Sequence, residues 1–249
     1  MLTDSHCHLY KEYYENIDEV LAIAKEHGIS RVINNGCDRN TNKEVLELVS
    51  KYEDMYGTLG IHPEYTDEYN LSDINFIEEN ISNKKIIAIG EIGLDYHYTK
   101  ENKDKQKELL EIQLKLAEKY DIPVIIHSRE ATLDTINILK KYNVKGIIHS
   151  FSGSLEIAKE YIKLGYLIGV NGVITFKNAN IKDVIKEIPL DSIVLETDSP
   201  YLTPEPYRGK KNNPSHIIDI ANFICELKNI SIEELANYTN SNLTKMFKI

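Results

Sequence analysis

Short runs of consecutive apolar residues, rich in isoleucine and valine, recur along the chain. Eight segments have this pattern, at residues 1–6, 31–36, 55–61, 85–92, 122–127, 144–149, 166–172 and 192–198. A strand that is half exposed alternates apolar and polar positions, whereas a strand of a parallel sheet covered by helices is apolar almost throughout. The pattern therefore predicts eight parallel strands.

Segments with apolar residues at helical spacing lie between most of these strands. We expect helices at 16–28, 40–52, 106–120, 133–142 and 155–165, and two more after the last strand, at 215–229 and 231–247. Gly28 is a plausible C-cap of the first helix. Ser231 and Glu234 have the spacing of a capping box at the start of the last one. A long irregular loop, 203–214, follows the eighth strand.

Eight strand–helix alternations in 249 residues predict a protein of the α/β class that folds as a (β/α)8 TIM barrel. A single barrel domain of residues 1–249 has an ordinary size for this fold. A doubly wound open sheet is the competing architecture. It normally has fewer strands and a glycine-rich phosphate loop, and the sequence contains neither a G-x-G-x-x-G nor a Walker pattern.

The cysteine content and the lack of targeting patterns indicate the cellular compartment. The three cysteines, Cys7, Cys37 and Cys225, lie far apart in the sequence, which argues against a disulfide framework and for a reducing compartment. The N-terminal residues lack the pattern of a signal peptide, and no apolar run approaches the roughly 18 residues of a membrane helix. We therefore expect a soluble cytoplasmic protein without a membrane partner, and a monomer, because no coiled-coil or strand-swapping signal is visible.

The net charge of −10 bears on the substrate. A protein that wraps duplex nucleic acid usually has a basic surface. Either nucleic acid is not the substrate, or bound cations and a local basic patch supply the attraction.

Histidine, glutamate and aspartate recur at the carboxyl ends of the predicted strands. They are His6, His8, His62, Glu91, His127, His149 and Asp198. In a barrel these ends converge on the face that holds the active site. Alternation along the first strand directs His6 and His8 to the same side, so both can reach one ion.

Four imidazoles and two carboxylates of this set form a candidate metal centre: His6, His8, Glu91, His127, His149 and Asp198. Such nitrogen and oxygen donors suit Zn²⁺, Mn²⁺ and similar divalent ions. Six ligands are too many for one catalytic ion that keeps an open position. They suit two ions, with Glu91 as the bridging carboxylate.

Motifs at these same positions resemble those of the TatD-type metal-dependent hydrolases of the amidohydrolase superfamily. The segments TDSHCHL, GIHP, GEIGLDY, IIHSREA and HSFSG, followed by LETDSPYL and RGKKNNP, span residue 3 to about residue 216 in the family's order. The resemblance implies a barrel with up to two divalent metals. His6, His8 and Asp198 match the first metal site, His127 and His149 match the second, and Glu91 matches the bridging carboxylate.

The resemblance also implies an activity. Characterised members resemble magnesium- or zinc-dependent deoxyribonucleases, often with 3′→5′ exonuclease action on single strands. We therefore expect a two-metal hydrolase that cleaves phosphodiester bonds of single-stranded DNA or 3′ ends with zinc, magnesium or manganese. Asp198 would orient and deprotonate the attacking water and Glu91 would assist as the second catalytic carboxylate.

Substrate contacts are expected from three residues near the strand ends. Arg208 in the 203–214 loop carries a guanidinium that matches phosphate geometry. His62 and Arg129 lie beside the predicted ligands. Tyr96 and Tyr201 are candidates to stack on bases, because aromatic stacking tolerates any base.

Two other functions remain open. The same metal site could hydrolyse an amide or ester, as in an aminoacyl-tRNA deacylase, because a barrel scaffold hosts many chemistries. A binding protein without catalysis would require a broken ligand set, and all six candidate ligands are present.

Overall fold

The computed structural model describes residues 1–97 and 101–249, which form two compact units. The first unit consists of residues 1–34 and 150–249, and the second consists of residues 35–149. The predicted single domain over residues 1–249 stays a prediction.

The first unit contains four strands with helices beside them. The strands are β1 (Leu2–Cys7), β2 (Ile29–Asn35, whose last residue belongs to the second unit), β7 (Tyr166–Val170) and β8 (Ile193–Leu195). The helices are α1 (Ile17–Glu26), α6 (Leu155–Lys163), α7 (Ile181–Glu187), α8 (Ile217–Lys228) and α9 (Ile232–Phe247), with 3₁₀ turns η2 (Gly172–Thr175), η3 (Leu190–Ser192) and η4 (Pro214–His216).

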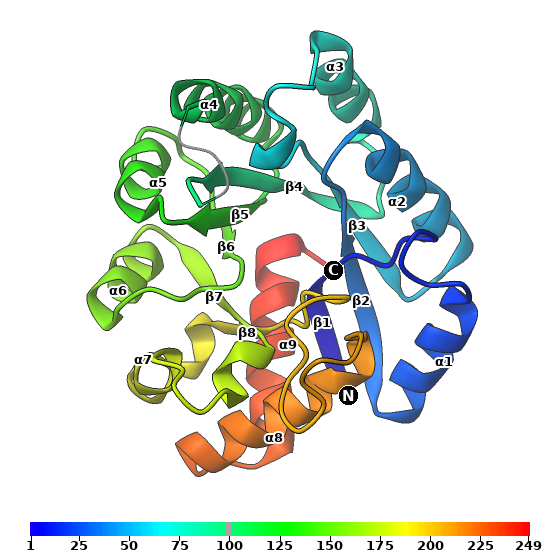
Figure 1. The fold of residues 1–249 in the computed structure, drawn as a ribbon, viewed down its shortest axis with the longest axis vertical. Helices are drawn as coiled ribbons and strands as arrows, with labels where there is room; N and C mark the ends of the chain where they lie inside the picture. Colours follow the sequence, from blue (N-terminus) through cyan, green and yellow to red (C-terminus); the bar gives the residue numbers. More distant parts are fainter. Residues whose placement is uncertain (98–100) are drawn as a thin grey trace. The chain divides into compact units, whose positions relative to one another are not determined.

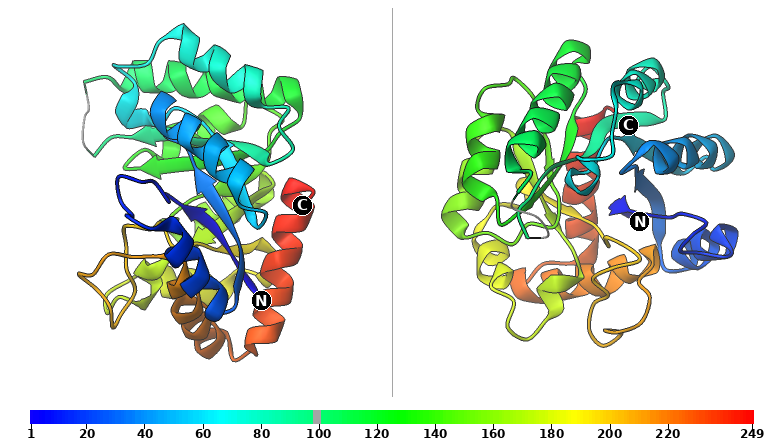
Figure 2. Two further views of the ribbon diagram at one scale, coloured as in Figure 1. Left: turned by 90° about the vertical axis from the view of Figure 1, so that its right-hand side faces the viewer. Right: turned by 45° about the horizontal axis from the view of Figure 1, so that its top comes forward.

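Parallel pairing organises these strands. β1 pairs with β2, β7 pairs with β8, and Cys7 at the end of β1 bridges to Ser199 after β8. Helix α9 packs beside β1 and β8, as the C-terminal red helix and the dark blue first strand show in Figure 1 and in the left view of Figure 2.

The second unit contains the other four strands. They are β3 (Met55–Leu59), β4 (Ile86–Asp95), β5 (Val124–Arg129) and β6 (Gly146–Ile148), paired in parallel in this order. The helices are α2 (Arg39–Lys51), α3 (Leu71–Asn80), α4 (Lys103–Tyr120) and α5 (Thr132–Leu139), with the 3₁₀ turn η1 (Pro63–Tyr65). The longest helix, α4, packs on β4.

Burial explains the near-continuous apolar runs. All ten residues of β4 are buried, and Ile89, Ile125, Ile147 and Ile193 on four different strands have no exposed surface. Such strands are covered on both faces, as the sequence pattern predicts.

Helices α3 and α7 are absent from the sequence prediction. Helix α7 has 7 residues and α3 has 10, so each makes only about two or three turns of 3.6 residues. The seven predicted helices are present, with boundaries shifted by a few residues.

The predicted helix ends are confirmed in part. Gly28 has φ +83° directly after His27, the C-cap of α1, where a left-handed residue terminates the helix. The Ser231 side chain accepts a hydrogen bond from the backbone N–H of Glu234 at the start of α9.

Over residues 1–97 and 101–249, no helix combines the length and apolar character that crossing a membrane requires. The three cysteines, all among the described residues, form no disulfide bond, and Cys7 is fully buried in the core of the first unit.

Two buried glutamines of α4 fix the backbone near the ends of strands in the second unit. Gln113 accepts from the N–H of Ile61 at 2.8 Å and donates to its carbonyl at 3.0 Å. Gln106 makes the same pair of bonds to Asp95, at 2.8 and 2.9 Å. Each side chain thus satisfies both polar groups of a residue that the buried chain would otherwise leave without a backbone partner.

We predict that Gln113→Leu lowers the free energy of unfolding by about 2–4 kcal/mol, since two buried backbone groups at Ile61 lose their partner at once. Urea denaturation followed by circular dichroism measures the change. Lys115→Ala, on the exposed face of the same helix, serves as the control and should change stability by less than about 0.5 kcal/mol. Equal stability of the two variants would contradict this account.

Candidate metal centre

Three predicted ligands of the first unit form a triangle. Nε2 of His6 lies 3.1 Å from Nε2 of His8. Oδ1 of Asp198 lies 3.7 Å from the His6 nitrogen and 3.5 Å from the His8 nitrogen. His6 is fully buried and His8 is 5% exposed, so the two imidazoles and the carboxylate converge from β1 and from the segment after β8.

The size of this triangle fits the ligand shell of one divalent ion. Nitrogen and oxygen ligands about 2.1 Å from a tetrahedral zinc ion are about 3.4 Å from one another. The three measured edges, 3.1, 3.5 and 3.7 Å, bracket that value. Two neutral imidazoles and a carboxylate are also the ligand types that zinc and manganese accept.

The buried carboxylate of Asp4 holds this triangle together. It accepts hydrogen bonds from the backbone N–H of His6 at 3.2 Å, from the N–H of Thr197 at 2.9 Å and from the Thr197 hydroxyl at 2.5 Å. Thr197 directly precedes Asp198, so one side chain fixes both His6 and Asp198. Burial raises the pKa of Asp4 to about 8, and the bonds from Thr197 and His6 offset only part of that rise.

Further contacts orient His8 and Asp198. The Tyr10 hydroxyl lies 3.2 Å from Nδ1 of His8, on the ring edge opposite Nε2. Asn34 bonds to both the N–H and the carbonyl of Leu9, the residue after His8. Asp198 has φ +56° in the left-handed region, a conformation rare outside glycine that clusters at functional sites. Its N–H bonds to the His6 carbonyl at 2.9 Å.

A second donor group surrounds Glu91 in the second unit. Oε1 of Glu91 lies 2.9 Å from Nδ1 of His127, 3.6 Å from Nε2 of His62 and 3.7 Å from Nε2 of His149. Glu91 is 3% exposed, and it comes from β4, while the imidazoles come from the ends of β3, β5 and β6. The group offers a carboxylate and three imidazoles to one ion.

His127 is fixed by a second buried acid, Asp95. Nε2 of His127 donates to Oδ2 of Asp95 at 3.0 Å, and Nδ1 faces Glu91. Burial alone would lower the pKa of His127, but hydrogen bonds to Asp95 and Glu91 outweigh burial and raise it to about 9. For Asp95 the directions are reversed. Burial would raise its pKa, but hydrogen bonds from His127 and from the backbone N–H of His97 outweigh burial and lower it.

Gly93 permits the close packing of β4 on β5 at this point. It has φ +155°, and a Cβ there would lie 1.9 Å from the His127 carbonyl oxygen. Only glycine fits this position between Glu91 and Asp95, which explains the second glycine of GEIGLDY in structural terms.

The structure thus gathers the predicted ligands into two groups. His6, His8 and Asp198 lie together in the first unit, and Glu91, His127 and His149 lie together in the second. His62, expected as a substrate contact, lies among the donors of the second group, with the Gln113 clamp on Ile61 next to it. The bridging role of Glu91 stays a prediction.

The other expected contacts have different surroundings. Arg129 ends β5 in register with Asp95 and is exposed. Arg208 is exposed, with its guanidinium 4.2 Å from the Phe176 ring centroid. Tyr96 is 5% exposed and donates to Asp134, so it offers no stacking face, whereas Tyr201 is 50% exposed.

Asp95 and Asp4 are functional neighbours that the sequence analysis missed. Asp95 lies four positions after Glu91 on the same strand, so alternation directs both side chains to one side. The same rule relates Asp4 to His6 on β1 and to His8 directly after it. Strand alternation was the available signal for both acids.

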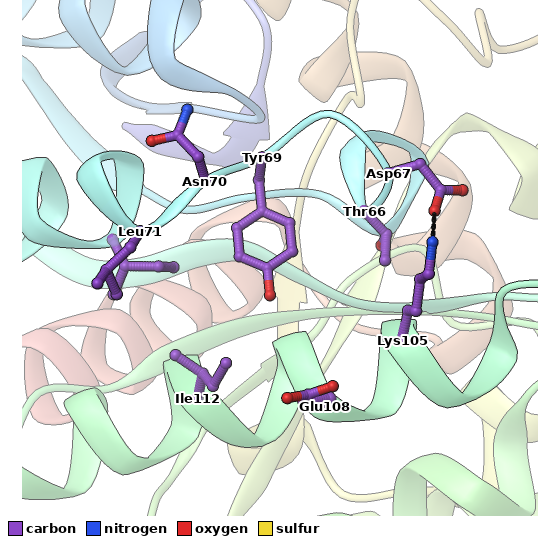
Figure 3. Close-up of a pocket in the computed structure, with 9 residues that line it drawn as sticks. Thr66, Asp67, Tyr69, Asn70, Leu71, Lys105, Glu108 and Ile112 are labelled. Atoms are coloured by element: carbon purple, nitrogen blue, oxygen red, sulfur yellow. Dashed lines mark hydrogen bonds and ion pairs between the residues drawn. The ribbon is translucent and has the colours of Figure 1, made fainter.

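A separate cavity of about 400 Å³ opens in the second unit between the segment 66–71 and helix α4. Figure 3 shows Tyr69 and Leu71 on one side, Glu108 and Ile112 on the other, and the ion pair of Asp67 with Lys105 at one end. None of the predicted site residues lines it.

Comparison with known proteins places this geometry in context. The model of the family described as TatD related DNase matches residues 3–248. The chain is 42% identical to the uncharacterized metal-dependent hydrolase YabD of Bacillus subtilis, over the full length of both, and 34% identical to the uncharacterized metal-dependent hydrolase YcfH of Escherichia coli K12, over all of this chain and 96% of that protein.

Solved structures of TatD proteins resemble the fold of this chain. The crystal structure of YjjV, a TatD homolog from Escherichia coli K12, superposes with a TM-score of 0.95 at 31% identity, over 100% of this chain and 98% of the other. A TatD family hydrolase from Entamoeba histolytica gives 0.86 at 28% identity, over 99% and 97%. The chain therefore has the predicted (β/α)8 barrel fold, with eight parallel strands in chain order, and the doubly wound alternative is excluded.

We predict that Thr197→Val lowers the free energy of unfolding by about 1–3 kcal/mol, because the buried Asp4 carboxyl loses its shortest hydrogen bond without a change in side-chain shape. Thr197→Ser keeps the hydroxyl and is the matched control, with a smaller loss. Thermal unfolding followed by circular dichroism distinguishes them. A valine variant as stable as the serine variant would show that the hydroxyl does not secure Asp4.

Proposed function

The chain belongs to the TatD family of metal-dependent hydrolases, and from this premise we propose that it is a deoxyribonuclease that cleaves single-stranded DNA from 3′ ends with two divalent ions. The observation that carries the proposal is the pair of imidazole–carboxylate groups, His6–His8–Asp198 and Glu91–His127–His149, with His62 beside the second. Each group has enough nitrogen and oxygen donors for one divalent ion, and the imidazole nitrogens suit zinc.

The two carboxylates have different tasks in this proposal. A bound divalent ion supplies a Lewis acid that neutralises phosphate charge and makes a coordinated water more acidic. The Asp198 side chain is 13% exposed and the Glu91 side chain 4% exposed. Asp198 is therefore the carboxylate that substrate and water can reach, and Oδ2 takes the proton while Oδ1 faces the two imidazoles. Glu91, held among buried imidazoles, acts as a metal ligand.

Cationic side chains compensate for the acidic balance of the chain. Arg208, Lys210 and Lys211 lie within four residues in the loop after β8, and Arg129 lies two residues after His127. The guanidinium groups of Arg208 and Arg129 can each bind a phosphate with two parallel hydrogen bonds. With bound ions, cationic groups in each unit would attract an anionic polymer despite a net charge of −10.

We predict that the purified protein with added zinc, manganese or magnesium hydrolyses fluorescent single-stranded DNA and bis-p-nitrophenyl phosphate, and that a chelator abolishes both activities. His6→Ala and Glu91→Ala should each lower kcat by at least about 100-fold, because a ligand is lost. His27→Ala, at the exposed end of α1, is the matched histidine control and should retain full activity.

An aminoacyl ester in the same panel separates the deacylase alternative. Hydrolysis of the ester without cleavage of either phosphodiester would overturn the nuclease proposal and keep the metal site. Near-full activity of His6→Ala with freshly added metal would overturn the ligand assignment itself.

A metal titration tests the two groups separately. We predict that the wild type binds two equivalents of zinc, and that His8→Ala and His127→Ala each bind one, because each substitution removes a donor from a different group. Isothermal titration calorimetry and elemental analysis measure the stoichiometry. One equivalent in the wild type, lost in both variants, would favour a single shared ion.

A further inference from the structure

Aromatic side chains form a continuous cluster beside the metal-ligand triangle of the first unit. The Tyr201 ring centroid lies 6.4 Å from that of His8 and 6.0 Å from that of Tyr13, both in edge-to-face arrangements. Tyr10 lies 5.7 Å from His8 and 5.8 Å from Tyr13. The cluster therefore begins at a predicted metal ligand and ends at Tyr201.

Hydrogen bonds fix Tyr201 within this cluster. The Tyr201 hydroxyl donates to the Tyr13 hydroxyl at 2.9 Å. The backbone N–H of Tyr201 bonds to the Asp198 carbonyl at 2.8 Å, and its carbonyl accepts from Asn212 at 2.6 Å. Tyr201 is thus held at both its backbone and its hydroxyl, only three residues after the proposed proton acceptor.

Exposure distinguishes Tyr201 from its neighbours. Tyr10 is 3% exposed, so its ring belongs to the buried base of the cluster. Tyr201 exposes half of its surface although it is large and apolar. An exposed aromatic ring held rigidly beside a catalytic group costs little entropy when a flat ligand stacks on it.

The loop that follows carries positive charge to the same place. Lys211 donates from Nζ to the Tyr13 carbonyl oxygen, and Nζ lies 5.4 Å from the centroid of the Tyr14 ring. A rigid aromatic face next to ammonium groups is the combination that proteins use to bind single-stranded nucleic acid, with stacking for the base and cations for the backbone.

We propose that Tyr201, braced by Tyr13, is the stacking platform for the unpaired base of the 3′-terminal nucleotide of single-stranded DNA. This inference rests on the proposed nuclease function and names the element that recognises its substrate. An edge-to-face stack of His8, Tyr201 and Tyr13 sets the base against the triangle of His6, His8 and Asp198. Stacking requires an unpaired base and tolerates all four bases, so the platform selects single strands without selecting sequence.

Steady-state kinetics on a short single-stranded oligodeoxynucleotide tests the platform. Tyr201→Ala should raise KM roughly tenfold, the loss typical of one base–aromatic stack, and leave kcat within about twofold. Tyr201→Phe keeps the ring face and should restore KM to within about threefold of the wild type. Tyr238→Ala, which removes a tyrosine of similar exposure from α9, is the control and should match the wild type.

A substrate with an abasic 3′-terminal nucleotide completes the design. If the base stacks on Tyr201, removing the base should raise the wild-type KM and abolish the difference between the wild type and Tyr201→Ala. A difference that persists on the abasic substrate, or a Tyr201→Ala variant with the wild-type KM on the normal substrate, overturns the platform while the nuclease function stands.

Equilibrium binding separates this proposal from the function on which it rests. An oligodeoxynucleotide with 2-aminopurine at its 3′ end, joined through phosphorothioate linkages that resist hydrolysis, should lose fluorescence when it binds the metal-loaded wild type, and Tyr201→Ala should bind roughly tenfold more weakly with less quenching. This measurement needs no cleavage. Quenching without hydrolysis of any phosphodiester would refute the nuclease proposal alone, and absence of quenching in the wild type would refute the platform.

Discussion

The carboxylate of Asp4 is the constraint on which the first metal-ligand group depends. A strand of six residues and a segment almost two hundred positions later must be aligned so that two imidazoles and a carboxylate meet within about 4 Å of one another. Asp4 achieves this because its two oxygens accept from His6 and from both donors of Thr197. Burial of an acid is costly unless such donors are present. The same hydrogen bonds that offset this cost also fix the residues of the candidate metal-ligand group.

In both units, side-chain amides also fix the backbone beside candidate site residues. Where a strand ends, the sheet no longer supplies partners for the backbone, yet the site residues sit at those ends. Asn34 bonds to both backbone groups of Leu9, Gln113 to those of Ile61 and Gln106 to those of Asp95. Each clamped residue is adjacent to His8 or His62, or is itself the partner of His127. Rigid support of this kind holds ligands in place before an ion binds.

The site therefore consists of two layers with different chemical requirements. The inner layer needs imidazole and carboxylate atoms, which a metal ion recognises by type and spacing. The outer layer needs amides and acids that match backbone donors and acceptors. Tyr201 is held in a similar way. Its hydroxyl donates to that of Tyr13 and its backbone carbonyl accepts from Asn212, while the residue stays half exposed. A site whose residues are held in this way keeps its geometry without substrate, whereas a site on a mobile loop must be ordered each time a substrate binds.

The sequence by itself determined the eight strands, seven of the helices and the candidate metal donors. Apolar runs and strand alternation are local properties, so they can be read from neighbours in the chain, and the motifs around His6, Glu91, His127 and Asp198 carry the family. Only the tertiary structure decided that Asp95 bonds to His127, that His62 lies among the candidate donors, and that Tyr201 is half exposed while Tyr96 is buried against Asp134. These outcomes depend on which side chains from distant segments meet, and the register of strands and the packing of helices decide that, because both are collective properties of the folded chain.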